Sequence, residues 1–185
     1  MKGFLLALAF ISAPAGAFAG AEVAGVLFPS ETLVDGRELA LNGAGLRVKV
    51  IFKVYAAALY AEKTSDDPAH FFALPGPMRV ELRFLRNVSG EDVAGAINDG
   101  FTKNSSAAEM EKLSARLADF TALIPDVKKG GGLSFNFRPG RGVEVLSGEK
   151  PLGEINGDDF SSALLRVWLG DEPADKRLKK GMLGL

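Results

Sequence analysis

Hydrophobic and polar residues alternate in two parts of the chain, which lie before and after a middle part with helical spacing. In the first part, apolar runs on both sides of Asp35-Gly36 predict a hairpin from Glu31 to Leu41, because both turn residues tolerate the positive φ of a type I′ turn. Gly43 to Gly45 predicts a bend. Leu46 to Ala61 contains β-branched and aromatic residues but no turn former, and therefore predicts one long strand. Met78 to Leu85 alternates again and predicts a strand with one polar face.

The middle part of the chain carries the capping residues of helices, followed by apolar residues at helical spacing. The segment Ser65 to Pro68 predicts the start of a short helix. Ser89 predicts the N-cap of a second helix, and Ser106 with Glu109 forms the capping box of a third. Apolar residues recur every three or four positions after both serines, so each of these two helices is expected to bury one face.

After Pro125 the alternating pattern returns and predicts three short strands, at 133–137, 143–145 and 152–155. An amphipathic helix that ends at Gly170 follows, and then a short helix from Pro173. Antiparallel hairpins with helices grouped in blocks indicate an α+β fold, in which helices cover one face of a sheet. The other face needs a cover of its own or contact with water.

Composition and charge narrow the class of protein. The chain has 185 residues, of which 47% are hydrophobic and 24% charged, which is typical of one folded domain with a sizeable core. The formal net charge is −1, and positive and negative residues are interspersed along the chain. This pattern predicts no nucleic-acid partner. Without cysteine there is no disulfide, so stability has to come from the apolar core.

The first nineteen residues have the features of a secretory signal. Lys2 precedes an apolar run from Phe4 to Ile11, and Pro14 follows. The small-x-small triplet Ala17 to Ala19 predicts cleavage before Gly20, and a later cut after Ala21 also fits the pattern. The apolar run is too short to span a bilayer. We therefore expect a domain of residues 20–185 that is exported, in a bacterium to the periplasm, without stable membrane insertion.

Arg47 is a cation inside an apolar segment with β character. Because arginine keeps its proton inside proteins, a buried guanidinium needs an anion or several acceptors. Strict alternation in the predicted strand places Tyr55 on the same face as Arg47, while Lys49 and Lys53 are expected at the solvent-exposed rim. A guanidinium beside a phenol at the end of an apolar slot suits an amphipathic carboxylate. The alternative is a structural arginine that pairs with backbone carbonyls or an internal acid.

Other chemistry is weakly represented in the sequence. The chain has one histidine, His70, and no cysteine, so we predict no metal site, and without a glycine-rich phosphate loop before a helix we predict no cofactor. Five apolar residues are candidates for the lining of a ligand site, although residues at such spacing more often belong to the core: Phe84, Phe101, Leu117, Phe120 and Trp168.

Several segments together suggest a family. GAGLR (43–47), KVYAAALYAEK (53–63), FLRNVSGEDV (84–93) and the run from Asp159 to Gly184 occur in an order and spacing that resembles the chalcone isomerase superfamily, in particular its bacterial exported branch of chalcone isomerase-like proteins. The resemblance covers essentially all of residues 20–185. It implies an open-faced β-sandwich, in which a large antiparallel sheet is covered by helices on one face and holds a ligand cleft between them.

The resemblance also implies a function. Plant enzymes of this superfamily cyclise a chalcone to a flavanone, and related non-catalytic members bind fatty acids. Arg47 matches the arginine that both groups use, and Tyr55 matches the tyrosine that helps the binders. The enzymes have a threonine where this chain has Tyr55, and a tyrosine in the helical middle part, where 101–104 contains none.

The leading hypothesis is therefore a non-catalytic protein that binds a small amphipathic anion, such as a fatty acid, with Arg47 and Tyr55 at the polar end of the cleft. One alternative is an isomerase, an intramolecular lyase that acts on an unsaturated carbonyl compound of the chalcone type, with Arg47 as the electrophile. A second is a partner-binding protein of the cell envelope, in which the cleft has lost its role.

Overall fold

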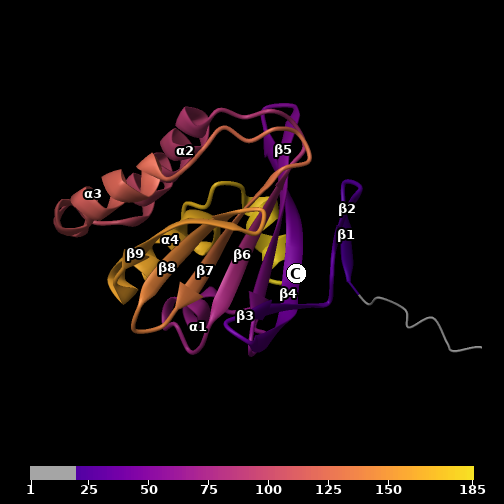
Figure 1. Cartoon of the computed structure of the whole chain (residues 1–185), viewed down its shortest axis with the longest axis horizontal. Helices are drawn as coiled ribbons and strands as arrows, with labels where there is room; N and C mark the ends of the chain where they lie inside the picture. Colours follow the sequence, from indigo (N-terminus) through magenta and orange to yellow (C-terminus); the bar gives the residue numbers. More distant parts are fainter. Residues whose placement is uncertain (1–19) are drawn as a thin grey trace, which may run out of the picture.

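The computed structural model describes residues 20–185, and the predicted secretory signal at 1–19 lies outside the described residues. Seven antiparallel strands form one sheet in sequence order (Figure 1). They are β3 (Glu31–Val34), β4 (Arg37–Lys49), β5 (Phe52–Ala61), β6 (Met78–Phe84), β7 (Gly132–Arg138), β8 (Gly142–Ser147) and β9 (Lys150–Asn156). A separate hairpin of β1 (Ala21–Val23) and β2 (Val26–Phe28), which we did not predict, precedes the sheet.

Five helices accompany the sheet: α1 (Pro68–Phe72), α2 (Gly90–Asn104), α3 (Ala107–Ala122), α4 (Asp158–Leu169) and α5 (Lys176–Met182). The predicted cap at Ser89 and the capping box of Ser106 with Glu109 are both present. The last helix begins at Lys176 instead of Pro173, because the Asp175 carboxylate accepts hydrogen bonds from the first free N–H groups of the helix. None of the helices described here has the length and apolar character needed to cross a membrane.

The main core lies between one face of the sheet and the helices. Helix α4 is buried along most of its length, packs on β8 and contacts α1 and α2, while α3 packs near β9 (Figure 1). Alternate residues of β5, from Tyr55 to Ala61, point into this core. The predicted α+β class, with helices covering one face of a large antiparallel sheet, is confirmed.

The opposite face of the sheet is covered in two different ways. Over β4 and β5 the hairpin of β1 and β2 closes a second apolar cluster, which contains Phe28, Leu39 and Tyr60. Over β6 to β8 the face carries hydrogen-bonded polar side chains. Arg79 donates to the side-chain oxygen of Asn136 at 2.7 Å, and Asn136 donates to a Glu144 carboxylate oxygen at 2.8 Å.

The prediction of one strand from Leu46 to Ala61 is wrong, because the chain turns at Val50-Ile51 and forms the hairpin of β4 and β5. This turn contains none of the residues that favour turns, and Val50 has a φ of +60°. Pairing of β5 with β4 on one side and with β6 on the other overrides the local preference.

Gly43 and Gly45 do not end the strand, since β4 runs through them, with a register shift against β5 between Leu41 and Gly43. A Cβ at Gly43 would collide with the carbonyl oxygen of Gly181, and one at Gly45 with that of Leu178. The two glycines therefore let α5 approach the backbone of β4 closely.

Candidate ligand-binding site

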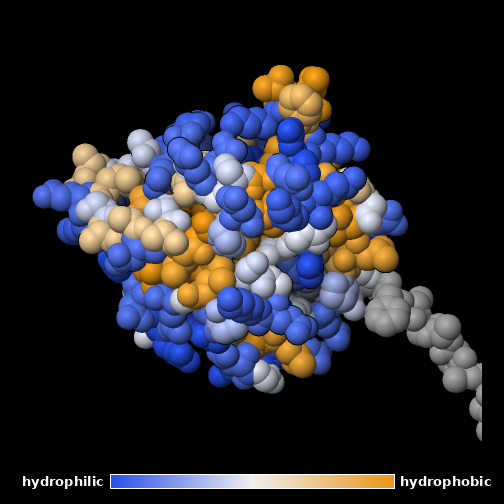
Figure 2. Space-filling view, turned by 45° about the horizontal axis from the view of Figure 1, so that its top comes forward, coloured by the Kyte–Doolittle hydropathy of each residue, from blue (hydrophilic) through white to orange (hydrophobic). Residues whose placement is uncertain are grey.

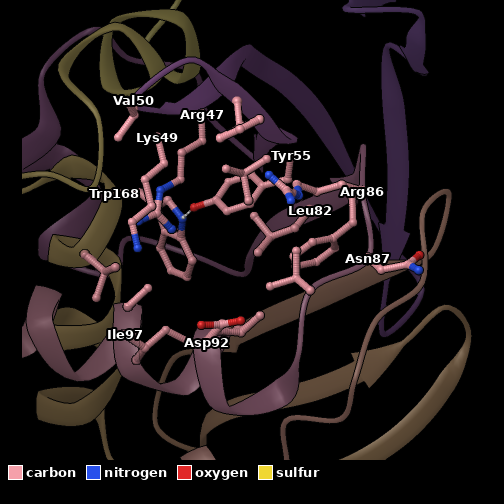
Figure 3. Close-up of a pocket in the computed structure, with 17 residues that line it drawn as sticks. Arg47, Lys49, Val50, Tyr55, Leu82, Arg86, Asn87, Asp92, Ile97 and Trp168 are labelled. Carbon is pink, nitrogen blue, oxygen red and sulfur yellow. Dashed lines mark hydrogen bonds between the residues drawn. The ribbon is translucent and has the colours of Figure 1, made fainter.

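A cavity of about 340 Å³ opens beside the end of the β4–β5 hairpin. Its walls come from the hairpin, β6, the loop after β6, the first half of α2 and the last turn of α4. Figure 3 shows these side chains around an open space. The lining residues are Arg47, Lys49, Val50, Phe52, Val54, Tyr55, Leu82, Phe84, Arg86, Asn87, Val88, Asp92, Val93, Ala96, Ile97, Val167 and Trp168.

Arg47 is half-buried at the polar side of this cavity. It is the cross-strand partner of Tyr55, and its guanidinium carbon lies 5.5 Å from the centre of the Tyr55 ring. Within residues 20–185, no carboxylate lies within ion-pair distance of its guanidinium nitrogens. The nearby Asp175 carboxylate instead accepts hydrogen bonds from the backbone N–H groups of Val48, Arg177 and Leu178. The guanidinium is thus left to face the cavity.

Tyr55 is buried, and its hydroxyl oxygen accepts a hydrogen bond of 3.1 Å from Nε1 of Trp168 (Figure 3). Burial raises the pKa of the Tyr55 phenol above its ordinary value, although the Arg47 charge and the Trp168 hydrogen bond act in the opposite direction. The phenol therefore keeps its proton at neutral pH. Because the oxygen already accepts from Trp168, the O–H group is available to donate to a further acceptor.

The remaining walls of the cavity are mainly apolar. Leu82 and Phe84 project from β6, and the Phe84 ring packs against that of Tyr55 with 5.5 Å between centroids. Val93 and Ile97 come from α2, one helical turn apart, because the apolar stripe of that helix faces the sheet. The arrangement combines a polar end with an apolar wall.

Of the five predicted lining residues, Phe84 and Trp168 reach the cavity described here, and Leu117 does not. Phe101 and Phe120 are fully buried in the main core, where their rings pack against Phe160 at 5.4 and 5.5 Å. They lie deeper because each extends the apolar stripe of its helix away from the hairpin and toward α4. The structure therefore does not bring these two residues to the site.

Several lining residues were not identified from the sequence. Asp92 follows Ser89 in the first turn of α2, where an acid is explained by the helix dipole alone. Arg86 lies in a loop, and its guanidinium carbon is 4.8 Å from the centre of the Phe52 ring. Neither residue has a spacing that signals a site, because both reach the cavity only through the packing of α2 and of the loop after β6 beside the hairpin.

A second, more polar cavity of about 490 Å³ adjoins the first. Arg47, Lys49, Asp92 and Ala96 line both cavities, so Arg47 stands at their boundary. The other walls come from further positions of α2, from Glu91 in its first turn to Lys103, and from the segment before α5, and they include several acids. Polar groups of a ligand held at Arg47 therefore have a second, polar space beside them.

Together these features define a small α+β protein with a half-open, mostly apolar cavity and a fixed cation at its polar end. A family model described as chalcone isomerase-like matches residues 20–184, and the chain belongs to this family. Among solved structures, it is similar to a fatty-acid binding protein of Arabidopsis thaliana, with a TM-score of 0.67 and 18% sequence identity over 86% of this chain and 92% of that chain. At this identity the likeness shows the shared fold. A comparison with curated proteins finds no match.

Proposed function

We propose that this protein binds a small amphipathic anion, such as a fatty acid, without catalysing a reaction on it. The observation that carries the proposal is the half-buried guanidinium of Arg47, which has no carboxylate partner among the described residues and faces an apolar cavity. A cation removed from water needs an anion, and a bound carboxylate supplies one.

The geometry gives each part of such a ligand a partner. The two carboxylate oxygens match the fork of N–H groups on the Arg47 guanidinium. The Tyr55 hydroxyl oxygen accepts a hydrogen bond from Trp168, and its O–H group donates a hydrogen bond to one of these carboxylate oxygens. The acyl chain then lies along the apolar side chains of β6 and α2, where burial of its methylene groups adds affinity.

The size of the cavity limits the length of the chain that it encloses. An apolar cavity of about 150 Å³ holds one benzene molecule, so by proportion 340 Å³ accommodates roughly ten to fourteen carbon atoms. We therefore propose medium-chain fatty acids as the best enclosed ligands. The ends of longer chains would reach solvent through the open side.

Export to a bacterial periplasm is part of the same proposal. It rests on the signal-like residues 1–19, and the family match begins at residue 20, the position after the predicted cleavage. Expression with the native N-terminus, followed by cell fractionation and N-terminal sequencing, tests both the location and the cleavage site.

The proposed function is tested by replacing Arg47 with methionine, which keeps an unbranched apolar side chain at this position and removes the charge. We expect the affinity for dodecanoate, measured by isothermal titration calorimetry, to fall roughly 10- to 100-fold, because a charge-assisted pair of hydrogen bonds is lost. The free energy of unfolding should change little, since no internal ion pair is broken.

Arg79→Met is the matched control for this experiment. Arg79 is also half-buried, but it lies on the opposite face of the sheet and donates hydrogen bonds to Asn136 and Thr32. This variant should lose stability and keep its affinity for dodecanoate. A structural role of Arg47 would give the reverse result, with Arg47→Met unstable and the affinity of the folded fraction unchanged.

The isomerase alternative has less support from the site. Tyr55 is the one phenol that lines the described cavity, and it is hydrogen-bonded to Trp168, while Tyr60 lies on the opposite face of the sheet. The described cavity thus lacks a second phenol that could donate a proton to a developing enolate. Turnover of a chalcone above its spontaneous rate, abolished by Arg47→Met, would favour the isomerase.

A further inference from the structure

The turn between β4 and β5 exposes three large hydrophobic residues in a row. Val50, Ile51 and Phe52 are 89%, 78% and 53% exposed, at the end of the hairpin. Figure 2 shows hydrophobic side chains protruding there above a hydrophilic surround. Such a row on a projecting tip is costly in water, because it offers apolar surface without covering any core.

The turn geometry does not require these side chains. Val50 occupies the first position of a two-residue turn with a φ of +60°, where glycine is free of strain and a β-branched residue is not. The strained backbone and the exposed surface both oppose folding stability. Function is the usual reason for keeping such a combination.

Basic side chains surround this tip. Lys49 and Lys53 flank the turn in sequence and are exposed, and the exposed Arg86 packs its guanidinium over the Phe52 ring. The loop with the exposed Lys128 and Lys129 lies beside that of Arg86, since the Lys129 N–H donates to the side chain of Asn87 at 2.8 Å. These five cations are called the basic collar below.

Two of the acids near the basic collar are engaged in hydrogen bonds, while Glu91 lines the second cavity together with Lys49. Asp126 accepts from the N–H of Gly90 at 2.8 Å, and Asp92 accepts from the Ser89 hydroxyl at 2.7 Å. Both carboxylates therefore support the start of α2. The end of the molecule that carries the tip combines apolar side chains at its point with positive charge around them.

The tip is also continuous with the cavity. Val50 and Phe52 line it, as do Lys49 and Arg86 of the basic collar. An acyl chain that leaves a membrane at this end of the molecule would thus pass along apolar side chains into the site.

We propose that the tip and the basic collar dock the protein reversibly on the surface of an anionic phospholipid bilayer, from which the cavity loads or releases its ligand. Apolar side chains at the point enter the boundary between headgroups and acyl chains, while the cations remain among anionic headgroups. A narrow convex tip fits a deformable lipid surface better than the flat, closely packed interface that a protein partner needs. Loading of the cavity rests on the proposed function, whereas docking on the bilayer does not require a ligand.

The test uses protein that is expressed from the full sequence and purified. Its binding to vesicles that contain phosphatidylglycerol, and to vesicles of pure phosphatidylcholine, is measured by flotation. We expect binding to the anionic vesicles, weakened by salt, and little binding to the neutral ones. Ile51→Ser should reduce the partition coefficient about tenfold, because the variant lacks an aliphatic side chain that enters the bilayer. Leu33→Ser, which removes an aliphatic residue of 64% exposure from β3, should leave it unchanged.

A second pair of variants tests the charge. Lys128→Gln with Lys129→Gln should reduce binding to anionic vesicles by about tenfold at low salt, whereas Lys63→Gln with Lys112→Gln, the same loss of charge away from the basic collar, should have little effect. Thermal unfolding of all four variants checks that they remain folded.

The proposal is overturned if the wild-type protein ignores anionic vesicles or if Ile51→Ser binds them as well as Leu33→Ser does. If neither the wild-type protein nor any variant binds vesicles, and Ile51→Ser loses binding to a purified protein partner, the tip is a protein interface instead. Ile51 does not line the cavity, so Ile51→Ser should keep its affinity for dodecanoate in solution. Vesicle binding without any dodecanoate binding would refute the proposed ligand and leave the docking surface standing.

Discussion

At the scale of single residues, Tyr55 connects the packed core to the open cavity. Its ring is buried against Phe84, and its hydroxyl lies between Trp168 and the space in front of Arg47. The indole N–H of Trp168 has this oxygen as its hydrogen-bond acceptor in the structure. One phenol therefore orients a ligand and satisfies a buried donor.

Tyr55→Phe should therefore have two effects. The affinity for dodecanoate falls about threefold to tenfold with the lost donor, and the unfolding free energy falls by about 1–3 kcal/mol because the Trp168 N–H is left buried without an acceptor. Tyr60→Phe is the matched control, since the Tyr60 hydroxyl donates to the Pro29 carbonyl at 3.2 Å on the other face. It should lower stability by about 1 kcal/mol and leave affinity unchanged. Chemical denaturation and calorimetry measure both quantities, and equal loss of affinity in the two variants would contradict the assignment.

The sequence placed Arg47 and Tyr55 on one face for a reason that is only partly correct. Alternation along a single strand gives positions 47 and 55 the same side, and the two residues do share a face. They do so as opposite residues of a hairpin, which brings them much closer together than one strand would. The sequence could not place the loop cations Arg86, Lys128 and Lys129 beside the tip, because the end of the hairpin was not predicted.

At the scale of elements, the glycines of β4 control how α5 packs. Asp175, at the start of α5, also holds the N–H of Val48, so the position of this helix affects the strand segment that carries Arg47. Glycine was read from the sequence as a bend, since a bend and a close contact leave the same residue type behind. Caps and hydrophobic periodicity predicted the other helices well because those signals are local.

Gly43→Ala should destabilise the protein by about 1–3 kcal/mol, because the added Cβ collides with the Gly181 carbonyl. Gly95→Ala provides the comparison. Gly95 is exposed on α2 with open space around its Cα, so alanine should raise stability by about 0.5–1 kcal/mol. Urea denaturation measures both changes. A neutral Gly43→Ala would mean that α5 moves away easily.

At the scale of the whole molecule, two ion pairs link the helices over the main core. Arg116 of α3 forms two hydrogen bonds of 2.7 Å with the Asp159 carboxylate of α4, and Arg166 of α4 pairs with Glu109 of α3 at 3.1 Å. The Arg116 hydrogen bonds lower the pKa of Asp159, and the hydrogen bond from the Ser106 backbone, followed by that from Arg166, lowers the pKa of Glu109.

These shifts predict acid sensitivity. A carboxyl whose pKa is lowered by folding stabilises the protein above its unfolded-state pKa, and this contribution is lost as the pH falls through the folded-state value. The wild-type protein should therefore be more stable than Asp159→Asn at pH 7, and the difference should shrink below about pH 4. Thermal unfolding from pH 2 to 7 measures it. A difference that is independent of pH would show that the carboxylate charge contributes nothing.

The fold class was accessible from the sequence because hairpin turns, caps and the grouping of helices are written in short segments. The second apolar cluster was not, since the hairpin of β1 and β2 is too short to give a clear pattern. Its turn at Ala24-Gly25 has positive φ at both residues, yet alanine is not a turn signal.

The two outer strands of the sheet affect which partners the molecule accepts. β3 has four residues, while β9 contains Pro151, which has no N–H to donate, and pairs with β8 through a register shift. Short edges, proline and bulges all discourage a foreign chain from adding itself as a further strand. The outer strands therefore disfavour the addition of a peptide as a further strand, and contacts with other molecules are left to side chains.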